Sequence, residues 1–283
     1  MDLQLHEVLN PWLSSPEALT DALSGMAQLR SLSLHFLPIT GHLGVSQLFR
    51  KRAVLPALTC LDFRGITNYL EDLVAGLDAP RLGEIEVTFF EESISDLSRL
   101  SKFVDQIGSH NAHRQAHILS SSDAISVSFT QPGVPTCINL QVSCEQLSEQ
   151  LSFLTRVCDH FSTFIYDVED LRISARQRQR REGNLCGEQW LKSFKSFTGV
   201  KWLHFDGQSS VSIMRALEKA NTRGETLLPG MHKLCIPQPW SRNVAVRKVA
   251  MSLLTSHRVS GRSIVVEYER LCDISEPHEA GTL

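Results

Sequence analysis

The sequence predicts an α/β protein: an irregular, leucine-rich-repeat-like solenoid with a curved, mostly parallel sheet and outer helices. Three observations support this prediction. A short apolar pattern recurs at intervals near 30 residues, segments with a helical apolar stripe lie between its copies, and 42% of the 283 residues are hydrophobic, which is enough to build a sizeable core. Because one such unit cannot bury its own apolar face, neighbouring units are expected to stack.

The recurring pattern is an apolar residue, two variable residues, an apolar residue, one variable residue and a last apolar residue. Its final residues alternate, as expected for a strand with one buried face. Six copies lie at 29–34, 58–63, 82–87, 168–173, 200–205 and 231–236. The starts differ by 29, 24, 86, 32 and 31 residues, and the gap of 86 predicts degenerate units, one of them at 113–119.

Helices are predicted between these strands. Ser14 to Glu17 form a capping signal before a helix over 18–25. Glu91, Glu92 and Asp96 are interpreted as acidic residues at the N-terminus of a helix that begins near Asp96, where the helix dipole favours negative charge. Apolar stripes predict the other helices at 68–77, 97–107, 145–161, around 190–194, 211–220 and 244–254.

The middle of the chain departs from the repeat. Residues 125–129 and 138–142 alternate like strands, and the Pro- and Gly-containing segment 131–136 between them is typical of a turn. We therefore expect an antiparallel excursion of the sheet near 121–143. We expect one repeat domain over 1–272, with an exposed basic loop at 176–183 and a disordered tail at 273–283.

Composition narrows the functional classes. The net charge of −3 gives no support for nucleic-acid binding. The seven cysteines are scattered without Cys-x-x-Cys spacing, which favours reduced, mostly buried thiols. The N-terminus does not resemble a signal peptide, and no apolar stretch has the length of a membrane span. We therefore expect a monomer in the cytoplasm or nucleus, with no contact with a membrane.

No motif predicts catalysis or a cofactor. The phosphate-binding, nucleophile-elbow and zinc-protease patterns are absent from the sequence. His110, His113 and His117 would share a helical face and could bind a metal, but their surroundings favour a turn with solvated histidines. The basic run 176–181 is interpreted as a solvated loop, with a phosphate-contacting or nuclear-import patch as the alternative. We expect no catalytic residues, no metal and no cofactor.

Strand alternation selects the candidate binding residues. Polar side chains between the apolar strand positions should point to the concave face, which solenoids commonly use for binding. The candidates are Asp62, Arg64, Glu86, Thr88, Arg172, His204 and Asp206. Trp190, Trp202 and Phe205 are expected in the core. The predicted function is a non-enzymatic protein-binding module; the alternatives are a degenerate repeat scaffold and a hydrolytic enzyme that uses His204 and Asp206, or the histidines near 113.

Several phrases resemble a known family. They lie at 55–63 (LPALTCLDF), 69–74 (YLEDLV), 77–82 (LDAPRL), 86–90 (EVTFF), 189–191 (QWL) and 197–203 (FTGVKWL). In this order they resemble the basidiomycete-type F-box/leucine-rich-repeat family over roughly residues 26–240. The resemblance implies the substrate-recognition part of a cullin-type ubiquitin ligase, with an unknown protein substrate. No F-box is visible before the first repeat, so a cullin adaptor could bind only through an F-box outside this chain.

Overall fold

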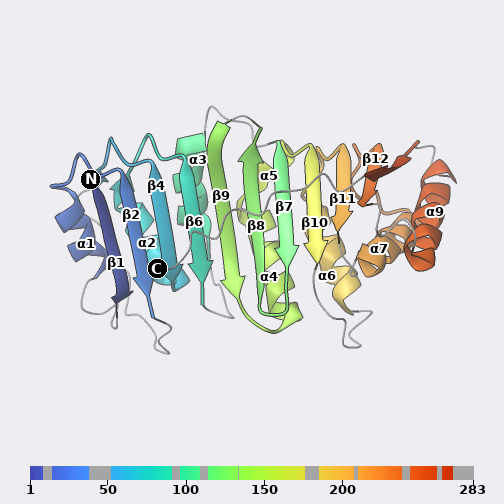
Figure 1. Cartoon of the computed structure of the whole chain (residues 1–283), viewed down its shortest axis with the longest axis horizontal. Helices are drawn as coiled ribbons and strands as arrows, with labels where there is room; N and C mark the ends of the chain where they lie inside the picture. The colour runs from blue at the N-terminus through green and yellow to red at the C-terminus, as the bar shows by residue number, and fades with distance from the viewer. Residues whose placement is uncertain are drawn as a thin grey trace.

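The computed structural model describes residues 1–8, 15–37, 52–90, 96–108, 114–132, 134–175, 185–206, 210–237, 243–259 and 263–269. They form a mixed α/β fold in which helices pack against a large, mostly parallel sheet (Figure 1). The basic run, the tail at 273–283, and the residues Glu91, Glu92, His110 and His113 lie outside the described residues.

One sheet of eleven strands runs through the described part of the chain, in the order β1-β2-β4-β6-β9-β8-β7-β10-β11-β12-β13. The strands are β1 (Asp2–Val8), β2 (Ser31–Phe36), β4 (Cys60–Gly65), β6 (Glu84–Phe89), β7 (Gln115–Ser120), β8 (Ala124–Gln131), β9 (Val134–Ser143), β10 (Asp170–Ala175), β11 (Trp202–Asp206), β12 (Lys233–Pro237) and β13 (Val265–Glu269). β3 (Ala53–Val54) and β5 (Leu77–Asp78) form a separate parallel pair.

The repeat copies mark real strands. Each of the six copies ends inside β2, β4, β6, β10, β11 or β12, and the degenerate copy at 113–119 overlaps β7. Their apolar positions are buried in matching register: Leu32 lies opposite Leu61, and Leu61 opposite Ile85. The repeat did not predict β1, β13, or the small pair β3 and β5, which lie outside its copies.

The helices lie on one side of the sheet, behind it in the view of Figure 1. They are α1 (Pro16–Leu23), α2 (Thr67–Ala75), α3 (Ser98–Gly108), α4 (Leu147–His160), α5 (Ser162–Tyr166), α6 (Leu185–Phe194), α7 (Ser210–Thr222) and α9 (Val244–Val259). Each helix predicted from an apolar stripe is present. None of these helices is both long and apolar enough to cross a membrane.

The core lies between the sheet and the helices. It includes fully buried aromatic side chains from strands and helices, such as Phe63, Phe89, Phe129 and Phe194. Trp190 and Phe205 are buried, as predicted. The prediction for Trp202 was wrong: it occupies an alternate position of β11, on the face of the sheet away from the helices, and is only half-buried. The alternation that buries Leu203 and Phe205 excludes Trp202 from the core.

The antiparallel excursion predicted near 121–143 is confirmed. β8 pairs antiparallel with both β7 and β9. The meander is inserted in reverse order: β9, its last strand, pairs parallel with β6, whereas β7, its first strand, pairs parallel with β10. In Figure 1 the arrow of β8 points opposite to its neighbours. Because β7 and β9 both run antiparallel to β8, each is parallel to its flanking strand, and the buried rows continue across the whole sheet.

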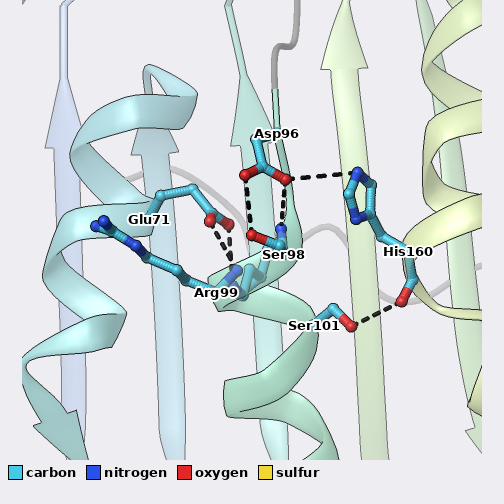
Figure 2. A network of polar contacts seen from close by, with 7 residues as sticks. Glu71, Asp96, Ser98, Arg99, Ser101 and His160 are labelled. Carbon is cyan, nitrogen blue, oxygen red and sulfur yellow. Dashed lines mark hydrogen bonds and ion pairs between the residues drawn. The ribbon is translucent and has the colours of Figure 1, made fainter.

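A polar network joins the helices near the middle of the layer (Figure 2). The Glu71 carboxylate, on α2, accepts the backbone N–H groups of Arg99 at 2.8 Å and Leu100 at 2.9 Å. These N–H groups belong to the first turn of α3, which has no intrahelical acceptor for them. Glu71 therefore caps a neighbouring helix. Burial raises the pKa of Glu71 to about 7, although the two backbone hydrogen bonds act in the opposite direction.

The start of α3 is also fixed from its own side. Asp96 accepts the backbone N–H of Ser98 at 3.0 Å and its hydroxyl at 2.9 Å, which confirms the predicted acidic residue at this helix start. The Ser101 hydroxyl donates to the carbonyl oxygen of His160 at 2.7 Å, and His160 Nε2 lies 3.6 Å from Asp96. α3 is thereby tied to α2 on one side and to the end of α4 on the other (Figure 2).

Replacing Gly199 with Ala should destabilise the fold. A Cβ at this position, between α6 and β11, would overlap the backbone carbonyl oxygen of Tyr166, which cannot rotate away as a side chain could. We expect the free energy of unfolding, measured by urea denaturation, to fall by about 1–3 kcal/mol. Gly25→Ala is the matched control, because its Cβ would meet nothing closer than 3.8 Å. Equal stability of the two variants would contradict the packing described here.

Glu71 should make stability depend on pH. Its folded pKa of about 7 exceeds the ordinary value of 4.5, so between these values the folded state holds a proton that the unfolded state has lost. The contribution of Glu71 to the free energy of unfolding should therefore fall as the pH rises from about 5 to 8.

The measurement is urea unfolding of the wild type and Glu71→Gln at pH 5, 6, 7 and 8. The wild type should lose stability relative to the variant as the pH rises. Glu188→Gln, at an exposed first-turn position of α6, should follow the wild type throughout. Parallel pH curves for the wild type and Glu71→Gln would show that Glu71 has an ordinary pKa.

Candidate binding face

The face of the sheet away from the helices, here called the open face, carries every second strand residue. The strand register aligns these residues in rows across the sheet. The middle row runs from β1 to β13 through Gln4, Ser33, Asp62, Glu86, Asn139, Ser128, His117, Arg172, His204, Cys235 and Glu267. Nearly all of these residues are polar, whereas the helix-facing rows are apolar and buried.

The structure places all seven predicted binding residues on the open face. Asp62, Glu86, Arg172 and His204 lie in the middle row, and Arg64, Thr88 and Asp206 lie in the next row toward the strand ends. They form two groups, one on β4 and β6 and the other on β10 and β11. Four strand spacings, with β9, β8 and β7 between, separate β6 from β10, a distance of about 19 Å.

Asp62, from the first group, belongs to a connected set that is called the His35 cluster: His6, Ser33, His35 and Asp62. Asp62 Oδ2 accepts from His35 Nε2 at 2.6 Å and from the Ser33 hydroxyl at 2.9 Å. On the other side of its ring, His35 Nδ1 lies 2.9 Å from His6 Nδ1. The cluster spans β1, β2 and β4, and the side chains of His35 and Asp62 are only 19% and 24% exposed.

Acidic residues and thiols lie beside this cluster. Glu84 lies between Cys60 and Cys137 in the first row of the open face, next to Glu86 along β6. Burial raises the pKa of both thiols, and the Glu84 carboxylate raises it further. Both thiols are therefore protonated near neutral pH, which makes them poor nucleophiles.

The second group surrounds Asp170, in the Asp170 cluster: Gln115, Asp170, Arg172 and His204. Asp170 Oδ1 lies 3.1 Å from His204 Nε2 and 3.7 Å from Arg172 Nε, and Gln115 donates to Oδ2 at 3.5 Å. Oδ1 is buried and receives no aligned hydrogen bond from the described residues, so the contact with His204 is electrostatic rather than a directed bond.

The structure also shows the surroundings of the residues considered for hydrolysis and for metal binding. The carboxylate in contact with His204 is Asp170, whereas the hydrolytic alternative used Asp206, which is exposed at the next position of the open face. Of the three histidines considered for a metal, His117 is in β7 and lies 3.0 Å from the Ser174 hydroxyl. Among the described residues, no three or more His, Cys, Asp or Glu side chains form a group that could hold a metal ion.

Sequence reasoning missed His6, Ser33, His35, Gln115 and Asp170 as members of the two clusters. The same alternation that selected Asp62 and Arg172 places them on the open face. The sequence does not reveal the strand order. It is the strand order that brings Gln115 beside Asp170, although the two residues are 55 positions apart in the sequence.

The chain was also compared with known proteins. No family model, no curated protein and no solved structure matches it. The resemblance to the F-box/leucine-rich-repeat family therefore stays a hypothesis, and function must be argued from the open face.

Removing the Asp170 carboxylate should cost more stability than removing that of Asp206. Asp170→Ala leaves the half-buried His204 and Gln115 without this partner, so we expect a loss of about 1–3 kcal/mol in the free energy of unfolding. Asp206→Ala, an exposed carboxylate on the same face, should change it by less than about 0.5 kcal/mol. Chemical denaturation of both variants tests this, and a larger loss in Asp206→Ala would refute the assignment of partners.

Proposed function

We propose that the chain is a non-enzymatic protein-binding module and that the open face is its binding surface. One observation carries the proposal: helices cover one side of an eleven-stranded sheet (Figure 1), and the strand register places rows of polar side chains on the other side. At about 4.8 Å between strands, the face is about 48 Å across. That width suits a folded partner or a long extended segment better than a small ligand, which concave pockets bind.

The chemistry of the open face supports protein recognition. Each group carries charges of both signs on neighbouring strands: Arg64 is diagonal to Glu86 in one group, and Arg172 is diagonal to Asp206 in the other. Trp202 adds a half-buried aromatic ring to the second group, in register with Asp170 and Lys233. Tryptophan and arginine are the residue types that most often dominate binding energy at protein interfaces. The group on β10 and β11 is therefore the proposed centre of the contact.

The finer part of the proposal is a leucine-rich-repeat-like solenoid that recognises substrates for a cullin-type ubiquitin ligase. The support for a solenoid is the recurring strand–helix unit and its constant register over β2, β4 and β6 and again over β10, β11 and β12. The support for the ligase role is the family resemblance alone. That role requires an F-box outside this chain, and the alternative is a repeat scaffold with no ligase link.

Charge reversals on the open face should abolish partner binding. The face variant combines Arg64→Glu, Glu86→Lys, Arg172→Glu and Asp206→Lys, which change four exposed side chains and leave the net charge unchanged. The matched control makes four reversals at exposed helix positions: Asp21→Lys, Asp159→Lys, Lys192→Glu and Arg215→Glu. Both should keep the wild-type circular dichroism spectrum and melting temperature, because surface changes have small effects on stability.

Photo-crosslinking identifies the partner. A photoreactive amino acid at Glu86 or Arg172, in cells treated with a proteasome inhibitor, should capture proteins that the same probe at Arg215 does not. Those proteins should bind the purified wild type and the helix control but not the face variant. Binding that survives in the face variant and fails in the helix control would place the interface on the helices and overturn the proposal.

Recovery of a cullin adaptor would distinguish the ubiquitin-ligase role from a repeat scaffold with no ligase link. If the adaptor is captured together with the open-face partners, the ligase role gains direct support. If the open-face partners are captured without the adaptor, the chain is a stand-alone binding scaffold, and the family resemblance does not extend to function.

A further inference from the structure

Outside the proposed contact centre, the His35 cluster contains two imidazole rings in direct contact. His6 and His35 come from neighbouring parallel strands, and their Nδ1 atoms lie 2.9 Å apart. Their ring centroids are 4.5 Å apart, with the planes inclined at 77°. Two nitrogen ligands therefore meet at the end of the sheet formed by β1 and β2, where His6 is exposed to solvent.

Asp62 fixes the chemical form of His35. A carboxylate can only accept a hydrogen bond, so the 2.6 Å contact with Asp62 Oδ2 requires the proton of His35 on Nε2. The Nδ1 of His35 then carries no proton and accepts a hydrogen bond from the Nδ1–H of His6 at 2.9 Å, so a metal ion would replace this proton between the two rings. The Ser33 hydroxyl donates to the same Oδ2 at 2.9 Å and helps to hold the carboxylate in place.

This is the arrangement that tunes histidine ligands in metal sites. Histidines that bind metals usually donate the second ring N–H to a carboxylate, which fixes the ring and raises its basicity. We propose that His6 Nδ1 and His35 Nδ1 together bind one divalent transition-metal ion, with Asp62 as the positioning residue for His35. The described residues offer no third protein ligand at this place, so water would complete the coordination shell.

The two nitrogens lie close enough together for one metal ion to bind both. Two nitrogens bound at about 2.0–2.1 Å and at right angles lie about 2.9 Å apart, whereas tetrahedral angles separate them by about 3.4 Å. The present 2.9 Å is a hydrogen-bond distance between the two rings, and rotation of the exposed His6 ring would set either separation. The ion would lie beside the line that joins the two nitrogens, and the exposed His6 ring would rotate to direct its lone pair at the ion.

Titration with Ni²⁺ tests the proposal, because Ni²⁺, unlike Cu²⁺, does not readily oxidise the cysteines of this chain. The protein is produced without a histidine tag and titrated calorimetrically at pH 7.5. We expect one site that His6→Gln and His35→Gln each weaken at least tenfold. Asp62→Asn should weaken it by about 10- to 100-fold, the usual effect of removing a carboxylate that supports a histidine ligand.

His232→Gln is the matched control, because His232 lies at the start of β12, with its ring against Trp202 and its Nδ1 3.4 Å from the carbonyl oxygen of Gly230. It should leave Ni²⁺ binding unchanged. Circular dichroism monitors folding, and His6→Gln keeps the test valid if His35→Gln fails to fold, because His6 is exposed. Equal Ni²⁺ affinity and stoichiometry in the wild type, His6→Gln and His35→Gln, or no binding to the wild type at millimolar Ni²⁺, would overturn the proposal.

Discussion

The backbone hydrogen bonding of β9 with β6 and of β7 with β10 is the constraint on which the rest of the structure depends. An antiparallel meander inserted in chain order would place β7 beside β6 and leave β9 to meet β10. In the observed order Ile138 continues the buried row of Ile85, and Ile118 continues the row of Ile173. Both the apolar core and the polar open face therefore run unbroken across all eleven strands of this sheet.

The helical layer depends on a different kind of contact. Parallel strands are separated by helices of unequal length, and the long excursion through β7, β8 and β9 separates α3 from α4 in the sequence. Ser101 bridges this discontinuity by bonding α3 to the end of α4, and Glu71 caps the same helix from α2 (Figure 2). The Glu71 carboxyl group is poorly solvated at this capping position, and its pKa is therefore raised.

Much of the fold was predictable because apolar spacing reports directly which residues are buried. The alternation around Leu61 and Phe63 predicted a strand, and the stripe at Leu97, Leu100 and Val104 predicted a helix. Strand order was not predictable, because either order of the meander satisfies the same pattern. The candidate residues were placed correctly on one face, but their partners were not, since His35 with Asp62 and His204 with Asp170 are contacts between strands. Trp202 was wrongly expected in the core, although it alternates with the buried Leu203 along the same strand.

The binding proposal follows from this architecture, since only an unbroken sheet presents its polar rows as one surface. The most direct test is therefore the strand order, measured by cross-strand amide–amide nuclear Overhauser effects in perdeuterated protein. The account predicts contacts of β6 with β9 and of β7 with β10, for example between residues near Val87 and Leu140 and between residues near Ile118 and Ile173. Contacts of β6 with β7 in their place would contradict it, and the neighbours assigned to each residue of the open face would be wrong.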